Sequence, residues 1–89
     1  MAFKKRGKLE IIYPILKCCR SRASRTRIAY SAYVNFKSST KYLDMLIEKG
    51  ILEEVRVGDK SSYRLTPKGV RLLYHLEHVM KILETEDYL

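Results

Sequence analysis

The chain has 89 residues with a formal net charge of +8 at pH 7, and 46% of its residues are hydrophobic. This length allows one domain with a small core, and the apolar content is typical of a globular protein rather than a disordered one. The longest uncharged apolar run, residues 11–16, is too short to cross a membrane, and the sequence shows no signal-peptide pattern. We therefore expect a soluble cytoplasmic protein that has no membrane partner.

The positive charge is concentrated in the first half of the chain. Residues 1–41 hold eleven Lys or Arg and one acid, a net charge of +10, whereas residues 42–89 hold seven Lys or Arg and nine acids, a net charge of −2. Such asymmetry indicates binding to nucleic acid or to an anionic membrane surface. Because no strongly amphipathic basic helix with exposed bulky apolar residues is evident, the sequence favours nucleic acid.

The chain begins with a basic arm, residues 1–7, which has no periodicity. Its cations Lys4, Lys5 and Arg6 could lie on phosphates or reach into a minor groove. A plain soluble tail is the alternative.

Residues 8–20 are predicted to form the first helix. Its buried stripe is expected to consist of Leu9, Ile12, Tyr13, Leu16 and Cys19. Pro14 lies about two turns into this helix, where it removes a backbone donor and crowds the carbonyl of Glu10, so we expect one kinked or bulged helix. Cys19 is expected in the core and its neighbour Cys18 partly exposed, and two adjacent cysteines make no disulfide framework.

Residues 24–50 predict two short helices joined by a tight turn. The first is expected over residues 24–33 and the second over residues 36–49, with residues 34–35 as the turn. Asn35 is a good N-cap for the second helix, and Gly50 lies where a left-handed residue ends a helix.

The second of these helices divides into two faces. The face expected against the core carries Phe36, Leu43, Leu46 and Ile47, with Ser39 and Thr40 beside them. The outward face carries Lys37, Ser38, Lys41 and Met45. A helix-turn-helix needs this division, because one face packs on the core while the other enters the DNA major groove. An ordinary amphipathic helix with solvated lysines is the alternative.

The segment before these helices, residues 21–27, is polar and strongly basic. It places Arg22, Arg25 and Arg27, together with Thr26, near the start of the first helix of the pair. Helix N-termini attract phosphate, and arginine adds bidentate donors. We predict that these residues hold the DNA backbone; solvated loop charge is the alternative.

Two strands follow, over residues 51–57 and 62–65, with a turn over residues 58–61. The pairs Val55/Val57 and Tyr63/Leu65 alternate with polar residues, as half-buried strands do. A hairpin in this position is expected to be a wing. Its tip residue Lys60 is a candidate phosphate contact.

Thr66 and Pro67 start a final helix that is expected to reach about residue 86. Its apolar stripe consists of Leu72, Leu73, Leu76, Val79, Met80 and Leu83. Such a helix is about 30 Å long, more than so small a domain can bury against itself. We predict that its far half pairs antiparallel with a second copy, through Leu72, Leu76, Val79, Met80 and Leu83. A helix folded entirely over its own core is the alternative.

The remaining candidates for site chemistry do not form a convincing group. His75 and His78 are three residues apart, but together with the two cysteines they do not show the spacing of a structural zinc site. No nucleophile–base grouping, carboxylate pair or glycine-rich phosphate loop stands out. We therefore expect no metal, no cofactor and no enzymatic activity.

Three stretches of the sequence, residues 8–16 (KLEIIYPIL), 26–30 (TRIAY) and 63–69 (YRLTPKG), resemble the small basic archaeal winged helix-turn-helix proteins. The resemblance covers nearly the whole chain. It implies that the C-terminal helix forms an antiparallel coiled-coil homodimer and that the protein binds duplex DNA. The sequence departs from the family pattern at two positions. Pro14 stands where a helix-compatible residue is usual. Ser39 stands where an apolar residue is usual, which implies looser packing of the recognition helix.

The sequence thus predicts a mainly α fold with a two-stranded β wing. Residues 1–66 would form a winged helix-turn-helix with a basic arm, and residues 67–89 a dimerisation helix, in one compact unit. The predicted function is duplex DNA binding by a dimeric transcriptional regulator associated with the nucleoid. The alternatives are a sequence-tolerant architectural chromatin protein and a winged helix that binds a protein or RNA.

Overall fold

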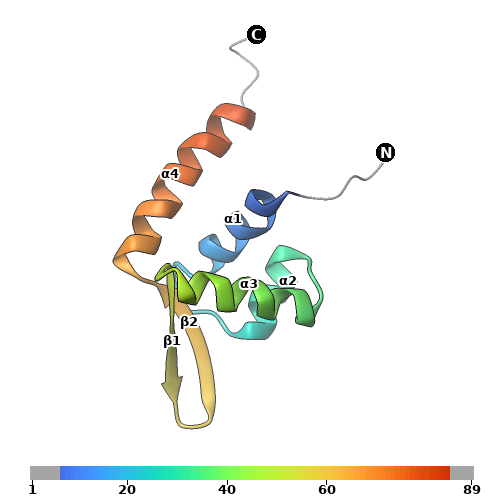
Figure 1. Ribbon diagram of the computed structural model, residues 1–89, viewed down its shortest axis with the longest axis vertical. Helices are drawn as coiled ribbons and strands as arrows, with labels where there is room; N and C mark the ends of the chain where they lie inside the picture. The colour runs from blue at the N-terminus through green and yellow to red at the C-terminus, as the bar shows by residue number, and fades with distance from the viewer. Residues whose placement is uncertain (1–6, 85–89) are drawn as a thin grey trace.

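The computed structural model describes residues 7–84 as four helices and a two-stranded antiparallel sheet. The elements are α1 (Lys8–Cys18), α2 (Arg25–Ala32), α3 (Phe36–Glu48), β1 (Leu52–Val57), β2 (Lys60–Leu65) and α4 (Pro67–Glu84). Figure 1 shows α2, α3 and the hairpin at one end of the molecule, while the second half of α4 projects from the other. The predicted fold, a helix-turn-helix followed by a β wing and a long helix, is confirmed.

Helix α1 is a single helix despite the proline inside it. It begins after Gly7, whose N–H donates to the Glu10 carboxylate at 2.7 Å, and it ends at Cys18, two residues earlier than predicted. Its buried side chains include Ile12, Leu16 and the following Cys19, as expected, but also Ile15, which the predicted stripe missed.

Leu9 is a correction to the predicted stripe of α1, because its side chain is exposed. It lies in the first turn, at the end of α1 farthest from the sheet, where the figure shows fewer neighbouring elements. Helical periodicity identifies a face, but it does not say how far along the helix that face stays covered.

The hydrophobic core lies where α1, α2 and α3 meet the base of the hairpin and the first half of α4. Its fully buried side chains include Ile15, Leu16, Ile28, Leu43, Leu46 and Leu52. Tyr63 of β2 joins this core, and its backbone N–H and C=O both bond to Ala23, at 2.9 and 3.0 Å. This bridge ties the loop before α2 to the sheet.

The hairpin differs from its predicted form at the turn. The strands pair from Leu52 with Leu65 out to Val57 with Lys60, so the turn has two residues rather than four. Gly58 has a positive φ of 62°. Two-residue hairpin turns require such a backbone conformation and therefore favour glycine. Val57 is exposed rather than half-buried, because it lies at the tip, beyond the reach of the core.

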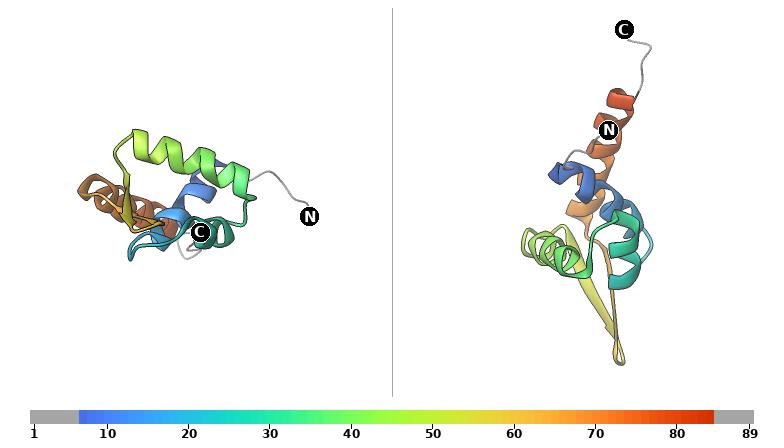
Figure 2. Two further views of the ribbon diagram at one scale, coloured as in Figure 1. Left: turned by 90° about the horizontal axis from the view of Figure 1, so that it is seen from below. Right: turned by 90° about the vertical axis from the view of Figure 1, so that its right-hand side faces the viewer.

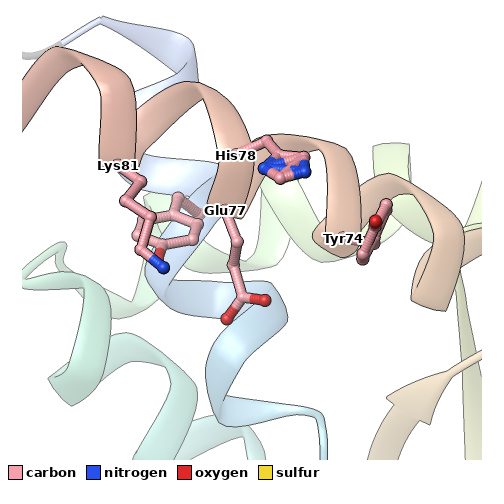
Figure 3. A pocket seen from close by; sticks show the side chains of 5 residues that line it. Tyr74, Glu77, His78 and Lys81 are labelled. Carbon is pink, nitrogen blue, oxygen red and sulfur yellow. The ribbon is translucent and has the colours of Figure 1, made fainter.

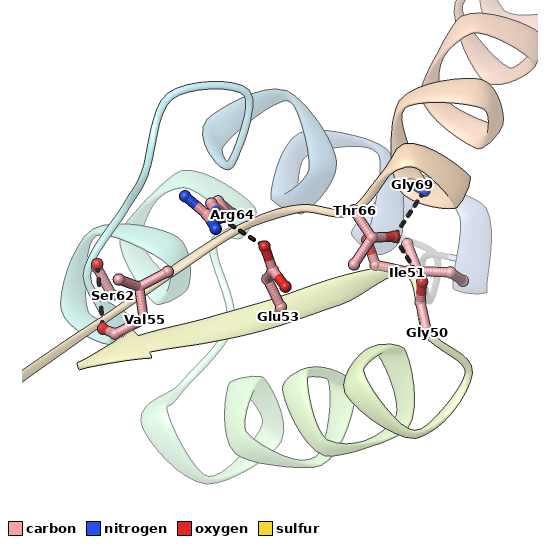
Figure 4. Close-up of polar contacts among 8 residues, drawn as sticks. All are labelled: Gly50, Ile51, Glu53, Val55, Ser62, Arg64, Thr66 and Gly69. Carbon is pink, nitrogen blue, oxygen red and sulfur yellow. Dashed lines mark hydrogen bonds and ion pairs between the residues drawn. The ribbon is translucent and has the colours of Figure 1, made fainter.

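Thr66 joins the end of α3, the start of β1 and the start of α4 (Figure 4). Its N–H donates to the Ile51 carbonyl at 3.0 Å, and its hydroxyl accepts from the N–H of Gly69 at 3.1 Å, which caps α4. A Cβ at Gly69 would collide with the Ile51 carbonyl oxygen, so only glycine allows α4 to approach this closely. The junction fixes the angle at which α4 leaves the domain.

Helix α4 is buried only along its first half. Leu73 and Leu76 lie in the core, whereas Val79 is 42% exposed and Leu83 is 66% exposed. Between α1 and the middle of α4 is a hollow of about 350 Å³, lined by Tyr13, Tyr74, Glu77, His78 and Lys81 (Figure 3). The predicted helix end near residue 86 lies outside the described residues. Within residues 7–84, no helix is both long enough and apolar enough to span a membrane.

Candidate nucleic-acid interface

Helix α2 is anchored on one side and open on the other. The Ser24 hydroxyl accepts from the N–H of Arg27 at 3.2 Å and so caps the helix. Ile28, Ala29 and Ala32 face the core, which leaves Thr26 and Arg27 on the exposed side.

The turn between α2 and α3 is held by backbone bonds. Tyr33 adopts the left-handed conformation, with φ 56°, and the N–H of Val34 donates back to the Ala29 carbonyl at 3.2 Å. Asn35 then caps α3, since its side-chain oxygen accepts from the N–H of Ser38 at 2.7 Å. The N-cap role predicted for Asn35 is confirmed. The start of α3 therefore has a fixed direction relative to α2.

Helix α3 presents lysines outward from a packed inner face. Leu43 and Leu46 are buried, and so is Ser39, whose hydroxyl donates to the Phe36 carbonyl at 2.8 Å. The buried hydroxyl is thereby satisfied inside its own helix, which removes the cost of placing it in the core. Lys37 and Lys41 are exposed, as predicted.

Three details of the predicted faces of α3 need correction. Phe36 is 52% exposed rather than buried, because it is the first residue of the helix and lies at the edge of the core. Met45 was assigned to the outward face, but it is half-buried and packs against the core. Ser38, assigned to the same outward face, is half-buried as well.

The exposed side of α2 and of the first part of α3, up to residue 43, carries positive charge only, whereas Asp44 and Glu48 are exposed farther along α3. No Asp or Glu occurs in residues 11–43. Arg27, Lys37 and Lys41 are exposed, and no described residue forms an ion pair or side-chain hydrogen bond with any of them. Cations without carboxylate partners remain available to phosphate, which is the main source of affinity for nucleic acid.

Arg25 was predicted to hold phosphate, but the structure gives it two partners inside the protein. Its guanidinium donates to the Tyr63 hydroxyl at 3.1 Å and lies over the Phe36 ring, 5.6 Å from the centroid. Arg25 therefore links the start of α2 to both β2 and α3. Its position explains how Phe36 is covered without entering the core.

The wing offers one cation at its tip. Lys60 is exposed there, next to Asp59. Arg64 pairs with Glu53 at 2.6 Å (Figure 4), and Arg56 pairs with Glu54 at 3.5 Å. Since both of these arginines already have carboxylate partners, Lys60 remains the wing's candidate for a phosphate contact.

The other predicted contacts are not all brought together with α3. Arg22 lines a groove of about 430 Å³ whose other residues belong to the loop after α1, to β2 and to α4, and none of them is on α3. Arg20, in the same groove, pairs with Glu77 at 2.6 Å. The arm cations Lys4, Lys5 and Arg6 lie outside the described residues.

The cysteines and histidines form no metal centre within residues 7–84, where no group of three potential ligands occurs. Cys19 is fully buried, and burial raises the pKa of its thiol from the usual 9.0 to about 12, with a smaller contribution from Cys18 and an opposing one from Arg27. Cys18 is half-buried, and its sulfur accepts from the Ser31 hydroxyl at 3.4 Å. Their predicted core and partly exposed positions are confirmed.

The sequence prediction missed two tyrosines at the helix-turn-helix turn. Tyr30 in the last turn of α2 is 81% exposed, and Tyr33 in the turn itself is 82% exposed. Their three-residue spacing within a predicted helix suggested no role, and only the fold shows that both rings reach solvent beside α3.

These features together define a winged helix-turn-helix: a capped α2, a rigid turn, an outward α3 and a hairpin that begins where α3 ends. The chain belongs to the winged helix-turn-helix family, whose match spans residues 5–84. The predicted family is thereby confirmed.

The chain is similar to two uncharacterized proteins of the archaeon Methanocaldococcus jannaschii. It is 35% identical to MJ0290 over 80 residues, which are 89% of this chain and 36% of that protein. It is 29% identical to MJ0287 over 83 residues, which are 92% of this chain and 81% of that protein. The chain therefore spans only about a third of MJ0290 but most of MJ0287.

Among solved structures, the chain is similar to Sso10a-2, a DNA-binding protein from Sulfolobus solfataricus. The two chains are 38% identical and superpose with a TM-score of 0.80, and the match covers 89% of this chain and 83% of Sso10a-2. It is also similar to the transcriptional regulator BldR from the same organism, with 25% identity and a TM-score of 0.73 over 84% and 55% of the two chains. The MarR family regulator SPO1453 of Silicibacter pomeroyi, at 20% identity and a TM-score of 0.75 over 86% and 57% of the two chains, shares the fold.

Proposed function

We propose that the protein binds duplex DNA as a dimeric transcriptional regulator. The observation that carries this proposal is the exposed side of α2 and α3, where Arg27, Lys37 and Lys41 have no carboxylate partners. A polyanion supplies the charge that this surface lacks, and a helix presented outward from a rigid turn fits the major groove.

In this proposal α3 enters the major groove by its N-terminal end. Lys37, Ser38 and Lys41 would face base edges there, while Arg27 and Thr26 would hold the phosphate strand beside the groove. Lys60 on the wing would reach the backbone on the other side of α3. Arg22 and the arm cations Lys4, Lys5 and Arg6 would add sequence-independent contacts.

The similarity to Sso10a-2 supports DNA as the partner, since that protein is DNA-binding and matches this chain at 38% identity. The similarity to the transcriptional regulator BldR supports a regulatory role. A protein with these properties would be associated with the nucleoid in the cytoplasm.

The proposed dimer uses the half of α4 that the protomer leaves uncovered. Val79 and Leu83 are exposed and Met80 is half-buried beside them, whereas Leu72, about two turns earlier on the same stripe, is half-buried against the protomer's core. Leu76, which the sequence placed at the interface, is 5% exposed and belongs to the protomer's own core, so we remove it from the proposed interface. A two-fold pair would present its two α3 helices to successive turns of one DNA face, about 34 Å apart.

The experiment that tests the proposal is fluorescence anisotropy with a labelled random-sequence duplex across a salt series. Arg22, Arg27 and Lys60 would make six phosphate contacts per dimer before the arm cations are counted, which predicts a log–log slope of about −5 or steeper. Failure to bind even at low salt would contradict DNA binding and favour a protein or RNA partner.

The exposed face of α3 also favours a second candidate function, that of a sequence-tolerant architectural DNA protein. The outward polar residues of its N-terminal half are two lysines and a half-buried serine, which contact many bases equally well. Selection of genomic fragments separates the two functions. A regulator should prefer its selected site over random duplex by about 1,000-fold or more, whereas an architectural protein should show a ratio near one.

A further inference from the structure

Tyr30 and Tyr33 are the most exposed large apolar side chains in residues 7–84, at 81% and 82%. They lie three residues apart, where α2 ends and the turn into α3 begins. Exposed apolar area that gathers on one part of a small domain marks an interaction site.

The backbone at Tyr33 has a conformation that tyrosine seldom adopts. It is the one residue other than glycine with a positive φ in the described part of the chain, and the other positive-φ positions there are Gly50 and Gly58. Glycine or asparagine normally fills such a helix-ending position, because a Cβ is disfavoured there. Because the ring of Tyr33 is largely in solvent, its burial offsets little of this backbone free-energy cost.

The residues around the two tyrosines are basic, which favours a polyanionic partner. Arg27 precedes Tyr30 by three residues on the exposed side of α2, so the two side chains share a face. Lys37 follows Tyr33 by four residues, which is at most about 14 Å of chain. No acidic residue occurs in residues 11–43.

The position of the turn relative to α3 indicates which polyanion would meet the two tyrosines. The turn leads directly into the N-terminal end of α3, and in helix-turn-helix proteins that end meets the base edges. In both views of Figure 2 the turn between α2 and α3 lies at one extremity of α3. A DNA strand bordering the groove would therefore pass beside the turn.

We propose that Tyr30 and Tyr33 form a contact surface for the sugar-phosphate strand that borders the groove entered by α3. Each ring packs against deoxyribose, and each phenolic hydroxyl donates to a phosphate oxygen. This inference rests on the proposed duplex binding and adds contacts that carry no charge.

The test uses two variants that should not harm the fold, measured with the full-length protein and the labelled duplex. Tyr33→Gly suits the left-handed position, and Tyr30→Ala suits an exposed helical one, so both should melt at or above the wild-type Tm. Each should raise the Kd for duplex DNA by about three- to ten-fold at every salt concentration. Because no cation is removed, the salt slope should stay that of wild type.

Tyr74→Ala is the matched control, since Tyr74 is a 60% exposed tyrosine on α4 rather than at the turn. It should leave the Kd within about two-fold of wild type. If wild type binds the duplex and the two turn variants bind equally well, the inference is overturned while the proposed function stands. Turn variants that change the mass in sedimentation but not the DNA affinity also overturn it, in favour of self-association. Failure of wild type to bind removes the proposed function itself.

Discussion

The two ends of the molecule expose opposite kinds of surface. At one end, α2, α3 and the wing expose Arg27, Lys37, Lys41 and Lys60; at the other, the second half of α4 exposes Val79, Ile82 and Leu83 (Figure 1). Charge without partners suits a polyanion, whereas uncovered apolar area suits a second protein surface. In the proposed function, one small domain would divide DNA contact and self-association between its ends.

The largest effect is expected from charges placed on the apolar end. Changing Val79 and Leu83 together to Glu should weaken self-association by about 100-fold or more, because a two-fold interface receives each change twice. The protomer should still fold, since both side chains are exposed within it. Analytical ultracentrifugation measures the effect.

The matched control for this change lies on the same helix. Val70 and Ile82 are equally exposed but lie off the predicted stripe, so changing both to Glu should leave the dimer intact. Equal dissociation by both double variants would show that the proposed face is not the interface.

The next effect concerns the basic end. Replacing Lys37 and Lys41 by Ala should raise the Kd for duplex DNA by at least about ten-fold at low salt, because it removes two contacts to base edges from each protomer. Replacing Lys49 and Arg71 by Ala removes the same charge from positions away from the outward side of α3. If the second pair weakened binding as much as the first, net charge rather than the α3 surface would explain the affinity.

A smaller effect should separate two arginines that the sequence treats alike. Arg25→Ala should lower the free energy of unfolding by about 1–2 kcal/mol, because it removes the bond to the Tyr63 hydroxyl and uncovers Phe36. Arg27→Ala should change it by less than about 0.5 kcal/mol, since this side chain is exposed and bonds to no other side chain of the described residues. Urea denaturation measures both, and equal destabilisation would remove the distinction.

The smallest effect should be the pH dependence contributed by Cys19. Burial raises the pKa of its thiol from 9.0 to about 12, so the unfolded chain loses this proton first as the pH rises. The contribution to stability is therefore complete below about pH 9 and is lost as the pH rises toward 12. The free energy of unfolding of Cys19→Ala, measured from pH 8 upward, should fall less steeply than that of wild type. Identical slopes would contradict this assignment.

The order of elements could be predicted because each has a local signal. Ser24, Asn35 and Thr66 are capping residues whose side chains bond as their sequence positions imply, and Gly50 has the expected positive φ. The buried core of α3 followed from periodicity in the same way. These features depend on neighbours only a few residues away.

The candidate site could be predicted only in part, because side-chain partners depend on distant residues. Arg25 and Arg27 look equivalent in the sequence, but the fold brings Tyr63 and Phe36 to the first of them. Phe36 looks like a core residue by periodicity, but its place at the start of α3 leaves it at the edge. The sequence places Phe36 at the start of the helix, but how far the core reaches toward it, like the partners of Arg25, depends on residues distant in the chain.

The most direct test of the account is a backbone amide NMR titration of the protein with a short duplex. Chemical-shift changes should cluster at Arg27, Tyr33, Lys37 and Lys41 and should be small at Val79, Ile82 and Leu83. This result would place DNA at the basic end and leave the apolar end to the protein's own partner copy. Shifts that concentrate on the second half of α4 and spare α3 would contradict the division between the two ends.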